Sequence, residues 1–184
     1  DGLCVFPLKP GTKVPATQHG QDDAVADFSQ ISAWWKAMPE ANIGVHCAPS
    51  GLYVVDVDSG EGKPGQESWD ALVAEHGHTD TLTVRTQSGG LHFYYRMPEG
   101  AALKNTAGRL GKHIDTRGNG YVVAPGSIVN GRPYEIVNDA PVADLPQWIV
   151  DVLRPKPRPA PRPIEAEFAA PATEVHARVQ QLAD

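Results

Sequence analysis

The chain has 184 residues, of which 41% are hydrophobic, and it carries 16 Lys and Arg against 22 Asp and Glu, a formal charge of −6. This length and apolar fraction suffice for one packed domain of ordinary size and exclude a disordered or fibrous polymer. The excess of acid argues against a protein whose whole surface binds nucleic acid, because such binding depends on Lys and Arg neutralising phosphates.

The charge is unevenly distributed along the chain. Residues 1–84 carry a net −8, residues 85–117 a net +4 and residues 118–184 a net −2. The basic residues of the middle segment are Arg85, Arg96, Lys104, Arg109, Lys112 and Arg117. The sequence therefore allows a local cationic surface beside an acidic one, although the whole chain is acidic.

Two cysteines, Cys4 and Cys47, are too few for the disulfide framework of a small secreted domain or for a four-thiolate zinc site. No stretch approaches the roughly 20 apolar residues that a membrane helix needs, and the N-terminus lacks a signal-peptide pattern. We therefore expect a soluble, cytoplasmic protein with no membrane partner. Because the chain starts at Asp1 and enters the apolar segment 3–6 almost at once, we also expect an excised fragment.

The hydrophobic pattern before residue 154 mixes helices with strands. In chain order we expect a strand at 4–8, a helix at 29–38, strands at 43–47 and 52–58, a helix at 66–76, strands at 82–86, 91–96, 113–117 and 121–124, and a helix at 146–153. Trp69 faces the core in this interpretation, and Gly77 ends the second helix. The turns Ser88-Gly89-Gly90 and Gly118-Asn119-Gly120 look like hairpin turns, which predict a largely antiparallel sheet. With helices before and after the strands, an α+β sandwich fits better than a doubly wound parallel sheet.

The segment 155–163 has a proline at every second position, which forbids helical and ladder hydrogen bonds and favours an extended spacer. Beyond it, Thr173 can cap a short helix that carries Val175, Val179 and Leu182 on one side. We therefore predict a main domain at 1–153, a Pro- and Arg-rich linker at 154–164, and the truncated start of a C-terminal helical region at 165–184.

Two acidic residues project together at the end of the strand expected at 52–58. Side chains two apart in a strand share a face, so Asp56 and Asp58 lie together after Leu52 and Val54. Two neighbouring carboxylates repel each other unless a cation sits between them, and their hard oxygen atoms suit Mg²⁺ or Mn²⁺. The alternative is a strand end whose acids are merely solvated.

A second acidic candidate lies in the strand expected at 113–117. His113, Asp115 and Arg117 share one face, opposite Ile114. A third carboxylate beside Asp56 and Asp58 would make a site able to hold two divalent ions, as in-line displacement at phosphorus requires. The alternative is an ion pair between Asp115 and Arg117, or one made across the strands.

A glycine pair forms the third motif, Ser88-Gly89-Gly90, and the strand that follows it carries His92. Exposed backbone N–H groups in such a turn can receive a phosphate, and His92 could donate a hydrogen bond to the same phosphate chain. The segment does not have the P-loop spacing, because no Gly-Lys-Ser or Gly-Lys-Thr follows. The alternative is a turn without a ligand.

Together these motifs resemble the primase–polymerase family of the archaeo-eukaryotic primase superfamily, the type that plasmids, phages and mobile elements encode. The family pattern is an Asp-x-Asp motif, a small-residue turn leading to a His, and a hydrophobic residue followed by Asp, in that order. The matching segments here are Asp56-Val57-Asp58, Ser88-Gly89-Gly90-Leu91-His92 and Ile114-Asp115, with family-like flanks at 5–15, 42–45 and 117–125. The resemblance covers roughly residues 3–153.

The resemblance implies an archaeo-eukaryotic primase fold, with an RRM-like antiparallel sheet packed against a second α/β unit and the active site between them. It implies template-dependent nucleotidyl transfer with NTP or dNTP on a single-stranded DNA template and primer. Asp56, Asp58 and Asp115 would hold two Mg²⁺ or Mn²⁺ ions. His92, the Ser88–Gly90 turn, Arg117 and Lys13 would contact the nucleotide. The full-length protein would work with, or be fused to, a replicative helicase in a bacterial, archaeal or phage-infected cell.

The sequence also departs from the family pattern. Gly90 stands where the superfamily often has Ser two residues before the His, and the two cysteines leave no zinc-binding stem. Two other functions remain open. One is a metal-dependent nuclease or phosphohydrolase, which also uses clustered carboxylates. The other is a catalytically silent nucleic-acid-binding module, for which basic and aromatic residues on the exposed sheet face would be expected.

Overall fold

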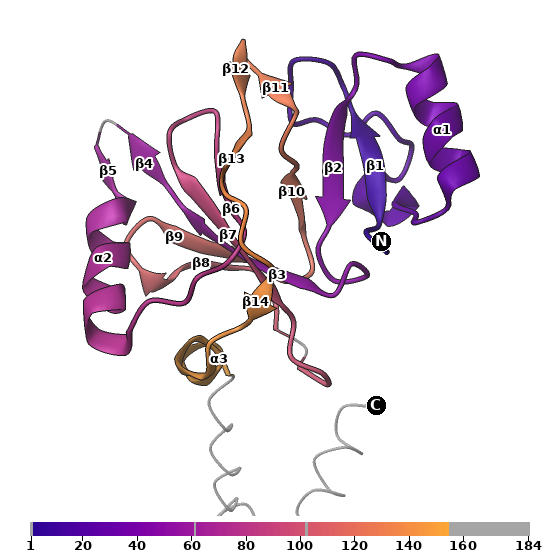
Figure 1. Ribbon diagram of the computed structural model, residues 1–184. Helices are drawn as coiled ribbons and strands as arrows, with labels where there is room; N and C mark the ends of the chain where they lie inside the picture. The colour runs from indigo at the N-terminus through magenta and orange to yellow at the C-terminus, as the bar shows by residue number, and fades with distance from the viewer. Residues whose placement is uncertain (1, 61, 102, 155–184) are drawn as a thin grey trace, which may run out of the picture. The chain divides into compact units, whose positions relative to one another are not determined.

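The computed structural model describes residues 2–60, 62–101 and 103–154 (Figure 1). Apart from Arg154, the predicted linker at 154–164 and the C-terminal helical region at 165–184 lie outside these residues. The helices are α1 (Phe28–Ala37), α2 (Gly65–His76) and α3 (Gln147–Leu153), with a 3-10 helix η1 (Gly20–Asp23). The strands are β1 (Val5–Leu8), β2 (Asn42–His46), β3 (Leu52–Val57), β4 (Ser59–Gly60), β5 (Lys63–Pro64), β6 (Thr83–Arg85), β7 (Leu91–Arg96), β8 (Thr106–Gly111), β9 (Ile114–Arg117), β10 (Tyr121–Val123), β11 (Ile128–Val129), β12 (Arg132–Pro133), β13 (Glu135–Asn138) and β14 (Ala143–Asp144).

The strands form two main sheets. One has three strands in the order β1-β2-β10, and the larger has the order β13-β6-β7-β3-β9-β8, with β14 running parallel beside β7. All other pairs in these two sheets are antiparallel, so the predicted α+β class with antiparallel sheets is confirmed. Figure 1 shows α1 beside the three-stranded sheet and α2 and α3 beside the larger one.

The side chains of the central strand β3 alternate between two cores. Tyr53, Val55 and Val57 belong to the core that contains residues of α2 and α3. Leu52 and Val54 belong to the core shared with β1, β2 and β10. Because strand side chains alternate, the next residue of this second set, Asp56, is turned toward the three-stranded sheet and away from α2 and α3.

The helices begin and end close to the predicted residues. The Asp27 side chain accepts the N–H of Gln30 at 2.8 Å and caps α1. Gly77, with a φ of 89°, ends α2 as predicted. Trp69 is buried as expected, with its ring stacked 4.7 Å from that of Phe93. Among the described residues, no helix is long and apolar enough to cross a membrane.

The hairpin predicted at Gly118-Asn119-Gly120 is wrong. Strand β9 pairs with β3 and β8, whereas β10 pairs with β2, so this tripeptide carries the chain from one sheet to the other. Asn105 gives the physical reason, since its Oδ1 accepts the N–H groups of Gly118 and Asn119 at 2.9 and 3.1 Å. The Gln21 side chain also donates to the Asn119 carbonyl at 2.9 Å. We call residues 118–120 the crossover.

The strand predicted at 113–117 begins at Ile114, and the placement of His113 on its face is wrong. His113 lies in the turn between β8 and β9 with a φ of 60°, in the left-handed region that ends a strand. Asp115 and Arg117 keep their shared face, since Ile114 and Thr116 are the buried residues of β9. Strand β8 was not predicted, because its two glycines weaken the strand pattern.

Gly118 gives a test of the crossover. A Cβ at this position would collide with the Leu103 carbonyl and lie 2.8 Å from the Tyr53 ring. We therefore expect Gly118→Ala to lower the free energy of unfolding by about 3 kcal/mol, the cost of overpacking a close contact. Urea denaturation followed by circular dichroism measures this loss.

Gly51→Ala is the matched control for the Gly118 variant. A Cβ at Gly51 meets nothing within 4 Å, so the substitution adds only the strain of a φ of 65°, about 1 kcal/mol. Equal losses in the two variants would mean that the crossover is not closely packed.

Candidate functional site

A row of polar side chains crosses the larger sheet on the face turned away from α2 and α3. In the strand register, Asp56 of β3 lies opposite His92 of β7 on one side and Asp115 of β9 on the other. His92 Nε2 lies 3.4 Å from Asp56 Oδ1. Because directly paired residues place their side chains on the same face, three neighbouring strands contribute to one site.

Arg117 joins the two carboxylates of this row. Its Nη2 lies 3.3 Å from Asp56 Oδ2 and 3.3 Å from Asp115 Oδ2. The other oxygen of Asp115 accepts the N–H of Gly108 at 3.2 Å. The ion pair considered above as an alternative for Asp115 and Arg117 is therefore present, and it extends across the strands to Asp56.

The environment of Asp56 favours its charged form. Burial by itself would raise the pKa of this carboxyl group, whose side chain is only 17% exposed. The hydrogen bond and charge of His92, together with those of Arg117, outweigh burial and lower the pKa of Asp56 below its ordinary value. Asp56 is thus an ionised acceptor in a partly buried position, the state that a metal ligand needs.

A pocket of about 320 Å³ opens beside the row. Its lining residues are Lys13, Gln21, Asp56, His92, Asn105, Arg117, Gly120, Tyr121, Val122, Val123 and Tyr134. Asp56, His92 and Arg117 come from the larger sheet, and residues 121–123 come from the three-stranded sheet, so the pocket lies between the two. Its volume is within the range of small-molecule sites, about 300–1,000 Å³.

Lys13 brings a second cation to the pocket. Its carbonyl accepts the Tyr121 hydroxyl at 2.9 Å, and the Thr12 carbonyl accepts Asn42 Nδ2 at 2.9 Å, so the loop that carries Lys13 is fixed at two points. The ammonium lies 5.9 Å from the centroid of the Tyr134 ring. Lys13 and Arg117 therefore give one pocket two positively charged side chains.

The other predicted residues lie outside the pocket lining. Asp58 follows the last residue of β3, is 38% exposed and pairs with Lys63 Nζ at 3.2 Å. The Ser88-Gly89-Gly90 turn joins β6 to β7 in the predicted hairpin. Gly90 packs on the end of β3, since a Cβ there would lie 2.5 Å from the Val57 carbonyl. The turn is thus close to the end of β3 where Asp58 lies.

The oxygen donors of the row fit a hard divalent cation. In the described part of the chain, no three His, Cys, Asp or Glu side chains are grouped as a metal-binding cluster, so Asp58, which pairs with Lys63, stands apart from Asp56 and Asp115. However, Mg²⁺ is usually bound by one or two carboxylates together with water and substrate phosphates. The convergence of Asp56 and Asp115 on the Arg117 cation shows that their oxygens can share one positive charge.

Sequence reasoning missed four polar or aromatic side chains of the pocket, which are Gln21, Asn105, Tyr121 and Tyr134. Two of them, Gln21 and Asn105, also bind the crossover. Neither belongs to the three motifs, and Gln21 is 98 residues from Asn119 whereas Asn105 is 13 residues from Gly118. The tripeptide at 118–120 was the one local signal, and its interpretation as a hairpin concealed the sheet change.

Sites that bind phosphate-bearing ligands together with divalent ions combine carboxylates and cationic side chains at a pocket, and this site has both. The family model described as "Bifunctional DNA primase/polymerase, N-terminal" matches residues 1–148. The chain therefore belongs to the bifunctional DNA primase/polymerase family, as its motifs predicted, and this membership indicates a nucleotidyltransferase connected with DNA replication. A search of curated proteins found no match.

The lowered pKa of Asp56 predicts how its contribution to stability changes with pH. A carboxylate whose folded pKa is below its unfolded value of 3.8 stabilises the fold fully above that value, and the contribution is lost as the pH falls through the folded pKa. We expect the difference in free energy of unfolding between the wild type and Asp56→Asn to shrink as the pH falls below 3.8. Urea denaturation at a series of pH values measures it, and a constant difference would contradict the ion-pair geometry.

Proposed function

We propose that the chain is a template-dependent nucleotidyltransferase that acts as a DNA primase and DNA polymerase in the replication of a plasmid, phage or mobile element. Family membership supports the type of reaction. The observation that carries the proposal is the pairing of Asp56 with Asp115 beside a pocket that also contains Lys13 and Arg117. The fold proposed with it is that of archaeo-eukaryotic primases, in which the larger sheet corresponds to the RRM-like sheet.

In the proposed reaction, a primer 3′-hydroxyl attacks the α-phosphorus of an incoming NTP or dNTP. The new bond joins the 3′-oxygen to this phosphorus, the bond to the bridging oxygen breaks, pyrophosphate leaves and the hydroxyl proton passes to solvent. The pocket would receive the nucleotide. Lys13 and Arg117 would bind its phosphates, because both cations line the pocket. The Ser88-Gly89-Gly90 turn is proposed to bind the far end of the triphosphate.

Asp56, Asp58 and Asp115 are proposed to hold two Mg²⁺ or Mn²⁺ ions. Such ions, when bound, lower the pKa of an attacking hydroxyl group and neutralise charge on the triphosphate. The chain itself orients the carboxylates: His92 lies against one oxygen of Asp56, and the Gly108 N–H donates to one oxygen of Asp115. In this arrangement His92 positions Asp56 in addition to its proposed contact with the nucleotide.

The proposed partners are a single-stranded DNA template and its primer. Exposed basic residues between 85 and 117 would meet their phosphate backbones, and Arg85, Arg109 and Lys112 are all exposed. A replicative helicase, fused to the full-length protein or working with it, is part of the same proposal. The reaction would take place in the cytoplasm of a bacterial, archaeal or phage-infected cell.

The two other functions are less well supported. A nuclease or phosphohydrolase would use the same carboxylates, but family membership favours synthesis. A silent nucleic-acid-binding module would place Asp56 and Asp115 against DNA phosphates, which these carboxylates repel unless a cation intervenes. Primer extension separates all three functions, because a nuclease shortens the labelled primer and a binding module leaves its length unchanged.

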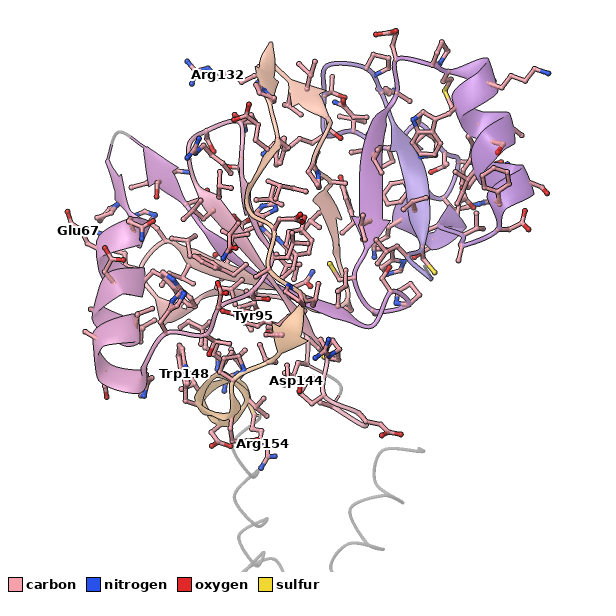
Figure 2. The ribbon with its side chains drawn as sticks, in the orientation of Figure 1. Glu67, Tyr95, Arg132, Asp144, Trp148 and Arg154 are labelled. Carbon is pink, nitrogen blue, oxygen red and sulfur yellow. The ribbon has the colours of Figure 1, made fainter. Side chains whose placement is uncertain are left out.

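The main test is primer extension with labelled dNTP or NTP and either Mg²⁺ or Mn²⁺. We expect the wild type to extend a primed template and Asp56→Asn to lose extension, because the amide removes a charged oxygen ligand. Asp144→Asn is the matched control: this residue is labelled in Figure 2, its side chain is 85% exposed, and it pairs with Arg96 outside the pocket lining. Extension that survives in Asp56→Asn, with circular dichroism showing intact folds, would reject the site.

Lys13 gives a second test of the pocket. Loss of one charge-assisted hydrogen bond to a phosphate costs about 1.5–3 kcal/mol, so we expect Lys13→Gln to raise the KM for nucleotide by roughly 10-fold or more. Steady-state extension at varied dNTP concentration measures the change. Lys9→Gln is the control, since Lys9 is exposed at the start of the same loop and does not line the pocket. Equal KM values for the two variants would exclude Lys13 from nucleotide binding.

A further inference from the structure

Arg117 holds both carboxylates of the site with a single nitrogen atom. Nη2 lies 3.3 Å from Asp56 Oδ2 and 3.3 Å from Asp115 Oδ2. A guanidinium keeps its positive charge in proteins. Proton transfer therefore cannot release the two carboxylates from Arg117, and only movement of this side chain can.

The hold of Arg117 on the carboxylates is loose. Charge-assisted N–H···O bonds are usually about 2.7–2.9 Å long, and both contacts here are 3.3 Å. Of the five N–H donors of a guanidinium, those on Nε and Nη1 have no hydrogen-bond partner among the described residues. The side chain is 33% exposed and lines the pocket. A ligand in the pocket can therefore reach unused donors of Arg117.

Among the described residues, Arg117 is the one cation that contacts both carboxylates, since Lys13 lines the same pocket but pairs with neither of them. Cys47 and Tyr94 lie beside the row, and burial raises the pKa of both, so neither adds a negative charge that would compete with Asp56 and Asp115 for Arg117. His92 contacts Asp56 but not Asp115 in the described contacts. Removal of the guanidinium would thus leave two neighbouring carboxylates with a strong need for a cation.

We propose that Arg117 is a built-in counter-ion that competes with divalent metal for Asp56 and Asp115 and is drawn away by the triphosphate. An ion bound to both carboxylates would lie about 2.1 Å from each oxygen, whereas Nη2 is 3.3 Å from the same two atoms. The two cations cannot share this position because they would repel each other at contact distance. A polyphosphate that forms bidentate hydrogen bonds with Arg117 frees the carboxylates for metal.

This coupling, which rests on the proposed function, has a reciprocal consequence. If the triphosphate raises the affinity for metal, then metal raises the affinity for the triphosphate by the same factor. Direct contact between metal and phosphate would also make the two ligands cooperative. It would not, however, make a variant without the Arg117 charge bind metal more tightly when no nucleotide is present. Tighter metal binding by such a variant than by the wild type, in the absence of nucleotide, therefore identifies the role of Arg117.

The test measures the affinity of the full chain for Mn²⁺ by electron paramagnetic resonance. The measurement is made once without nucleotide and once with a non-hydrolysable dNTP analogue. We expect Arg117→Gln to bind Mn²⁺ alone more tightly than the wild type, within the range of about 5- to 150-fold that is typical of coupled sites. The analogue should then raise the Mn²⁺ affinity of the variant less than that of the wild type. Arg132→Gln is the matched control, because Arg132 is exposed on β12 and does not line the pocket.

One result would contradict the competition between Arg117 and metal, and a different result would contradict the proposed function. Equal Mn²⁺ affinity of the wild type and Arg117→Gln without nucleotide would overturn the competition. A wild type that binds no Mn²⁺ even with the analogue would instead contradict the proposed function. If circular dichroism shows that Arg117→Gln does not fold, Arg117→Lys takes its place, since a compact ammonium keeps the charge but not the planar fork. We expect Arg117→Lys to show a smaller enhancement by the analogue, and an unchanged enhancement would reject the coupling.

Discussion

The site depends on the register in which β3 lies between β7 and β9. Pairing of Asp56 with His92 on one side and Asp115 on the other places the three side chains in one row. A slip by one residue would turn Asp56 toward α2 and α3 and send a valine to the pocket. The two cores oppose this slip, because Leu52 and Val54 are buried on one face and Tyr53, Val55 and Val57 on the other. An unpaired carboxylate in the helix-side core would be far more costly than a misplaced valine. The alternation of side chains that forms both cores therefore also places Asp56 at the pocket.

The side of the pocket that the three-stranded sheet forms depends on the crossover. Residues 121–123 reach the pocket only because residues 118–120 leave the larger sheet and enter the smaller one. Asn105 and Gln21 hold the crossover from two sides, and both also line the pocket. Gly118 and Gly120 permit this approach, since a Cβ on Gly120 would lie 2.6 Å from Asn105 Nδ2. The same side chains thus fix the connection between the sheets and shape the space that a ligand would occupy.

Much of the fold followed from local patterns. The strands with continuous apolar runs and the three helices were predicted within one or two residues, because burial on both faces and capping residues leave clear patterns in the sequence. The short strands β4, β5, β11, β12, β13 and β14 were missed, since they are largely exposed and have no such pattern. For the site, the two-residue spacing and the motif order pointed to Asp56, His92 and Asp115. A cross-strand ion pair was one of the alternatives for this segment, but Asp56 could not be predicted as the partner of Arg117, because that pairing depends on register and not on spacing.

The net charge of −6 does not describe what a phosphate group meets at this site. Two cations pair with the three acids of the motifs: Lys63 lies 3.2 Å from Asp58, and Arg117 lies 3.3 Å from both Asp56 and Asp115. The pair of Asp58 with Lys63 is exposed, so it contributes little and is screened by salt. Asp56 is largely buried and is held from two sides, so salt weakens its contacts less. High ionic strength would therefore loosen Asp58 first and leave the row of Asp56, His92 and Asp115 in place. Salt perturbs the row of Asp56, His92 and Asp115 least, and it screens the exposed pair of Asp58 with Lys63 most.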